Sequence, residues 1–86
     1  MVGVVLWQHP LLGFALVQCD VSLVLCSIEL GECHVGDRLL GDSNRLILQP
    51  VWNITRGLWC FAQVEATDMT EDEANYLLGF MPGLLS

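Results

Sequence analysis

Apolar side chains dominate the N-terminal third of the chain and follow a strand pattern rather than a helical one. Val2–Trp7 has no alternating polar positions, which predicts a strand buried on both sides. Gln8-His9-Pro10 begins a turn, and Gly13–Gln18 predicts a second strand. Val21–Leu30 is apolar on both of its period-2 faces, and its β-branched content favours a third buried strand over a helix. Gly31–Gly36 is then predicted to be a loop.

The second half predicts three further strands, at Asp37–Leu40, Arg45–Gln49 and Leu58–Glu65. The residues at 41–44, Gly-Asp-Ser-Asn, are strong turn formers and separate the first two of these strands. Pro50 is predicted to end the second strand, because proline cannot donate to a sheet ladder. Residues 51–57 are then expected to form a loop before the last strand.

A short helix is predicted to follow the last strand. Thr70 and Glu73 form a capping box, in which each side chain binds the backbone N–H of the other residue. The acids at 71–73 suit the positive end of a helix dipole, which explains them without an acidic site. One helical face is formed by Ala74, Leu77, Leu78 and Met81, with Gly79 and Pro82 as the expected stop. A helix of about two turns is too short to persist alone, so it must dock on another element, and the preceding strand is the nearest candidate.

The last strand has two different faces. Leu58, Cys60, Ala62 and Val64 form one face, which is expected to meet the helix. Trp59 and Phe61 share the other face, and Trp52 lies nearby in sequence. These three aromatic residues are candidate interface anchors. A second core layer is an equal alternative, since a small sheet has few ways to cover both faces.

Together these elements predict a single domain, residues 1–86, of the α+β class and mostly β. The expected architecture is a small antiparallel sheet or partly open barrel with one short C-terminal helix. Of the chain, 53% is hydrophobic, which is more than a small domain with little interior readily buries. A homo-oligomer or an obligate protein partner would cover the surplus, whereas an unusually rich core is the alternative.

The net charge of the chain limits the classes of macromolecule that it is expected to bind. The chain has no lysine, and its cations are Arg38, Arg45 and Arg56 against ten carboxylates, for a net charge of −7. Phosphate binding needs clustered cations, so no nucleic-acid partner is expected. A basic surface of a protein partner remains possible, although net charge of one sign also serves solubility.

The apolar N-terminal third is not expected to span a membrane. Polar residues at 8–10 and Asp20 interrupt it, and no basic flank sets an orientation. It lacks the basic region and cleavage site of a signal peptide, so a cytoplasmic location is expected, or the virion if the chain is phage-encoded. A segment lying in a membrane interface is the lesser alternative.

No pattern in the chain indicates catalysis, and no cofactor is expected. Cysteines lie at 19, 26, 33 and 60 without the short Cys-x-x-Cys spacing of a zinc knuckle, so no metal site is predicted. Cys33 and His34 are adjacent, which places their side chains on opposite faces of an extended chain and disfavours a nucleophile–base pair. Asn53-Ile54-Thr55 matches the glycosylation pattern but carries little weight without a secretory signal.

The C-terminal half carries a combination of motifs beyond these local rules. They are Val35-Gly36-Asp37, then Trp52, then Phe61-Ala62-Gln63-Val64-Glu65, then Asp68-Met69-Thr70-Glu71-Asp72-Glu73-Ala74 and Tyr76-Leu77-Leu78. This pattern resembles small proteins of unassigned function from tailed bacteriophages and prophages. The resemblance covers about residues 35–78 and does not extend to the start of the chain. It implies a virion-assembly or phage accessory protein.

The function expected from the sequence is therefore non-enzymatic. The chain is predicted to be a structural or protein-interaction module, oligomeric and phage- or prophage-derived. The alternative is an acidic inhibitor of the anti-defence type, which would bind a basic surface of a host protein. A small enzyme or metal protein dependent on Cys33 and His34 is the least favoured reading.

Overall fold

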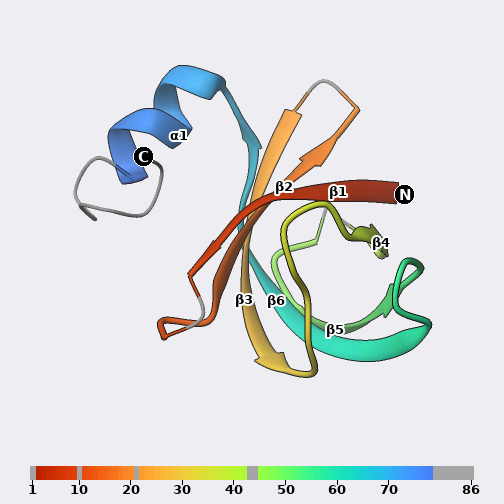
Figure 1. The fold of residues 1–86 in the computed structure, drawn as a ribbon. Helices are drawn as coiled ribbons and strands as arrows, with labels where there is room; N and C mark the ends of the chain where they lie inside the picture. Colours follow the sequence, from red (N-terminus) through yellow and green to blue (C-terminus); the bar gives the residue numbers. More distant parts are fainter. Residues whose placement is uncertain (1, 10, 21, 43–44, 79–86) are drawn as a thin grey trace.

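The computed structural model shows a closed antiparallel barrel of six strands with one helix outside it (Figure 1). It describes residues 2–9, 11–20, 22–42 and 45–78, with the side chains of 77 and 78 excepted. The strands are β1 (Val2–His9), β2 (Phe14–Cys19), β3 (Ser22–Leu30), β4 (Arg38–Leu40), β5 (Leu48–Asn53) and β6 (Leu58–Met69), and the helix is α1 (Glu71–Leu78). The predicted class, mostly β with a short C-terminal helix, is confirmed, and the barrel is closed rather than partly open.

The barrel closes through pairs that lie far apart in sequence. The strand order is β1-β2-β3-β6-β5-β4, and β4 returns to pair with β1. The hairpins β1–β2, β2–β3 and β5–β6 are local, whereas β3–β6 and β1–β4 join the two halves of the chain. Closure pairs each described strand with two neighbours, and the short β4 leaves only parts of β1 and β5 as local edges, which limits edge-to-edge aggregation.

The prediction for β5 was wrong. Pro50 lies inside β5 instead of ending it, and Val51–Asn53 continue the strand instead of starting a loop. The physical reason is that β4 pairs with β5 only at Trp52 and Asn53. At Pro50 the strand is therefore locally an edge with β6 on one side, where a missing N–H need not interrupt a ladder.

The apolar side chains divide into two cores. The first fills the barrel and includes Val5, Val17 and Val64. The second lies between α1 and the outer side of the barrel wall, and its members are Trp7, Leu16, Leu23, Met69 and Ala74. The predicted double burial of the third strand is confirmed for residues 23–26, whose side chains contribute alternately to both cores, but not at its end, where Leu30 is 66% exposed. On β1, however, Val2, Val4 and Leu6 are exposed, so that strand is covered on one side only over most of its length.

A β-bulge in β1 connects the two cores. The register with β2 shifts between Val5, which pairs with Val17, and Trp7, which pairs with Leu16. One extra residue in a strand reverses the alternation of its side chains. Val5 therefore points into the barrel, while Trp7 packs beside α1.

The predicted capping box of α1 is present. The Thr70 N–H donates to Glu73 Oε1 and the Glu73 N–H donates to Thr70 Oγ1, each at 3.1 Å. Ala74 is buried in the second core. Gly79, Met81 and Pro82 lie outside the described residues. The inner face of β6 does not meet the helix as expected: Cys60, Ala62 and Val64 point into the barrel, because closure encloses that face.

Candidate functional site

The three residues predicted as interface anchors lie near one another on the outside of the barrel. Trp52 on β5 and Trp59 on β6 are directly opposite in the register, and their rings meet edge to face with centroids 5.0 Å apart. Phe61 follows two residues after Trp59 on the same outward face of β6. The structure leaves Trp59 62% exposed and Phe61 39% exposed. The described residues therefore do not form a second core layer over this face.

Other apolar residues extend this surface across neighbouring strands. Val2, Leu40, Trp52 and Trp59 form one row across β1, β4, β5 and β6, since each is the register partner of the next. Pro50, Phe61 and Leu30 form a second row across β5, β6 and β3. We call these seven residues the aromatic face. The two rows carry no charged residue, and neighbouring strands lie about 4.8 Å apart, so their side chains form one continuous patch.

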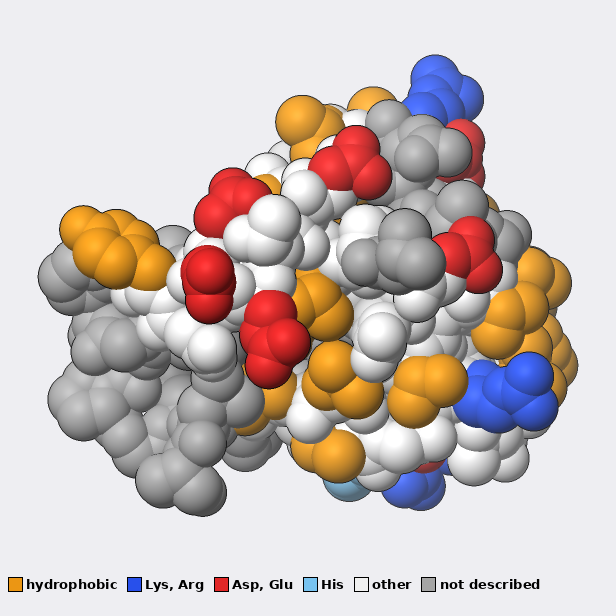
Figure 2. All heavy atoms as spheres, turned by 90° about the horizontal axis from the view of Figure 1, so that it is seen from above, with side chains coloured by type: hydrophobic (Ala, Val, Ile, Leu, Met, Phe, Trp, Pro, Cys, Tyr) orange, Lys and Arg blue, Asp and Glu red, His pale blue; other side chains and the backbone are white. Residues whose placement is uncertain are grey.

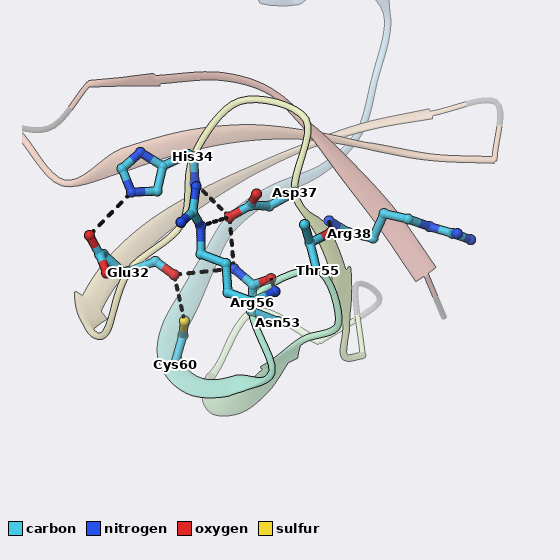
Figure 3. Close-up of polar contacts among 8 residues, drawn as sticks. All are labelled: Glu32, His34, Asp37, Arg38, Asn53, Thr55, Arg56 and Cys60. Carbon is cyan, nitrogen blue, oxygen red and sulfur yellow. Dashed lines mark hydrogen bonds and ion pairs between the residues drawn. The ribbon is translucent and has the colours of Figure 1, made fainter.

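A polar network lies at the end of the barrel where β5 turns into β6 (Figure 3). Asp37 is buried, and its Oδ2 accepts hydrogen bonds from Arg56 Nε at 2.7 Å, from Asn53 Nδ2 at 2.9 Å and from the His34 N–H at 3.0 Å. Asn53 Nδ2 also donates to the Glu32 carbonyl, which accepts from Cys60 Sγ as well. The network ties residues 32–37 to the β5–β6 turn and closes this end of the barrel.

Asp37 is held ionised by these partners. Burial on its own raises the pKa of the carboxyl, but the hydrogen bonds from Asn53, Arg56 and His34 and the charge of Arg56 outweigh it and lower the pKa below its ordinary value. Three donors within the network therefore already occupy Oδ2 of this carboxylate. The arrangement favours a structural role over general acid–base chemistry, which needs a proton acceptor within reach of a substrate.

The cysteines and histidines do not form a reactive pair in the described part of the chain. All four cysteines are buried and none is in a disulfide. Burial raises the pKa of Cys33 to about 11 and that of Cys26 to about 12, so both remain protonated and weakly nucleophilic at neutral pH. His34 Nε2 lies 3.2 Å from Glu32 Oε1, and His9 Nδ1 accepts from the Leu12 N–H at 3.0 Å.

Neither a metal site nor a ligand cavity is found inside the barrel among the described residues. No group of three or more His, Cys, Asp or Glu residues there is placed to hold a metal ion. The barrel interior holds an apolar space of about 40 Å³, whose lining includes Cys19, Cys26, Val64, Gly41 and Gln49. This is room for no more than a few waters. No helix in the described ranges is long and apolar enough to cross a bilayer.

Acidic side chains lie on α1 and also over the rest of the face seen in Figure 2. The first turn of α1 contributes Glu71, Asp72 and Glu73. The arginines lie on the part of the barrel away from α1, and acidic side chains lie beside them there as well, among them Asp37, which pairs with Arg56. Figure 3 shows the Arg38 side chain extending away from the Asp37 network.

Comparisons with known proteins place the chain in no established group: no family model, curated protein or solved structure matches it. The Asp37 network was not predicted from the sequence. In the sequence, Asn53 stands out only as part of a pattern that resembles a glycosylation acceptor. The structure buries this side chain completely and uses its amide inside the network.

Proposed function

We propose that this protein is a non-enzymatic protein-interaction module that self-associates through the aromatic face. The observation that carries the proposal is the edge-to-face pair of Trp52 and Trp59 on the outside of the barrel, with Phe61 beside it. Tryptophan side chains are strongly enriched at the centres of protein interfaces, where they bury large apolar areas.

The surroundings of the pair support an interface centre rather than a scattering of exposed apolar residues. The aromatic face is continuous across five strands, β1, β4, β5, β6 and β3, and rests on the hydrogen-bonded barrel wall. A rigid surface loses little conformational entropy on association. Because stable dimers bury roughly 800 Å² per partner, the seven residues form the centre of such an interface, with polar neighbours around them.

The oligomeric mass of the purified chain tests this proposal. Wild-type protein should give a multiple of the 9.5 kDa monomer mass by light scattering coupled to size exclusion. Trp59→Ser and Phe61→Asp should weaken self-association by about 30-fold or more, as expected for a residue worth 2 kcal/mol at an interface centre.

Tyr76→Ser is the matched control, because Tyr76 is an aromatic residue that is 74% exposed on α1 rather than on the aromatic face. It should leave the mass unchanged. A wild-type chain that stays monomeric at millimolar concentration, or equal effects of the Tyr76 and Trp59 substitutions, would contradict the proposal.

The excess of acids favours a second candidate function, that of an acidic inhibitor of a basic host protein. The net charge is −7, and Glu71, Asp72 and Glu73 in the first turn of α1 offer an anionic surface. Binding of this kind depends on long-range attraction, so its affinity should fall steeply as salt rises to about 0.5 M. Affinity that does not change with salt would rule out this candidate.

The origin of the protein in a tailed phage or prophage, and a role in the virion or as an accessory protein, is proposed on the sequence resemblance of residues 35–78. Those residues form β4, β5, β6 and α1, and they include all three predicted anchors. The genes beside this one test the proposal. Morphogenesis genes would support it, whereas a neighbourhood of host metabolic genes would count against it.

A further inference from the structure

We draw no further inference here: the strongest candidate, the apolar cavity between α1 and the outer side of the barrel wall at Leu6, Trp7 and Ala74, carries nothing because no feature of the described residues shows what covers it.

Discussion

At the scale of single residues, the carboxylate of Asp37 is buried within a network of hydrogen bonds. It contacts a cation, an amide and a backbone N–H, so its charge is shared among three donors. A buried charge with such partners stabilises the fold only while all of them are present, because removing one leaves the others unsatisfied. Asp37, Asn53 and Arg56 therefore act as one unit.

Asp37→Asn should lower the free energy of unfolding by about 2 kcal/mol at pH 7, because Arg56 loses a charge-assisted hydrogen bond. The same substitution should also change the pH dependence. The folded pKa of Asp37 lies below its unfolded value near 4, so its contribution is present above that value and is lost as pH falls through the folded pKa. Urea unfolding between about pH 7 and pH 2 measures both effects.

The variant should show a flatter fall in stability on acidification than the wild type, because the group that titrates has been removed. Asp72→Asn, at an exposed position on α1, is the control and should follow the wild-type profile closely. Parallel profiles for wild type and Asp37→Asn would show that Asp37 is not held ionised by the network.

Substitutions at two glycines would distinguish the energetic cost of backbone strain from that of a steric clash. Gly31 and Gly57 both have positive φ, 96° and 65°, but a Cβ at Gly31 would lie 2.9 Å from the Cα and Sγ of Cys60, whereas one at Gly57 would meet nothing within 4 Å. Gly57→Ala should cost about 1 kcal/mol for the left-handed backbone alone. Gly31→Ala should cost at least about 2 kcal/mol more, measured by chemical denaturation, since backbone atoms must move. Equal losses would mean that the loop at Gly31 adapts freely.

At the scale of elements, α1 depends on both its cap and its docking. Eight residues are too few for a stable isolated helix, so its stability comes from the capping box and from Ala74 in the second core. The sequence identified the cap correctly because its chemistry is local. It did not identify the docking surface, which is the outer side of the wall around Trp7 and not the inner face of β6.

Thr70→Ala and Glu73→Ala should each lower stability by about 1 kcal/mol, because each removes one side of the reciprocal box. The double variant should lose less than the sum, since each hydrogen bond positions the other residue. Amide hydrogen exchange in α1 should rise in all three variants, while exchange in β2 and β3 stays at the wild-type rate. Additive losses would mean that the two bonds form independently.

The strands show where local reasoning fails. Proline disrupts a strand mainly where the strand is hydrogen-bonded on both sides. β4 is too short to reach Pro50, so β5 is paired only with β6 at that position. The bulge at Leu6 moves Trp7 from the barrel to the second core, which no periodicity in Val2–Trp7 indicated. In both cases the deciding fact is the partner strand, which the segment itself does not contain.

At the scale of the whole molecule, the four cysteines report on opening of the barrel. They come from β2, β3, β6 and the loop after β3, and all are buried with no disulfide. Burial raises the pKa of three of these thiols, at Cys26, Cys33 and Cys60, so each is both inaccessible and protonated in the folded state.

A thiol reagent should therefore modify no cysteine rapidly in the folded protein and all four in denaturant. At low reagent concentration in native buffer the four should be labelled together, at a rate that follows the global unfolding equilibrium. Peptide mass mapping of the partly labelled protein provides the measurement. Early labelling of Cys19 or Cys33 alone would indicate that one end of the barrel opens independently.

The sequence by itself determined the features that depend on neighbouring residues. These are the β character of the apolar segments, the cap at Thr70 and Glu73, the excess of acids and the presence of large aromatic residues at 52, 59 and 61. Each follows from propensity, spacing or charge within a few positions, and such effects do not require knowledge of the rest of the chain.

Only the tertiary structure decided which side of each strand is inside. The barrel closes because β1 pairs with β4 and β3 pairs with β6. The entropic cost of closing the intervening loops depends on their length and does not specify which strands pair. That choice placed Trp52, Trp59 and Phe61 outside, brought Asp37 together with Asn53 and Arg56 from two separate segments, and left Trp7 Nε1 unpaired beside α1. Side-chain direction alternates along a strand, so a single bulge or a change of partner reverses what the local pattern predicts.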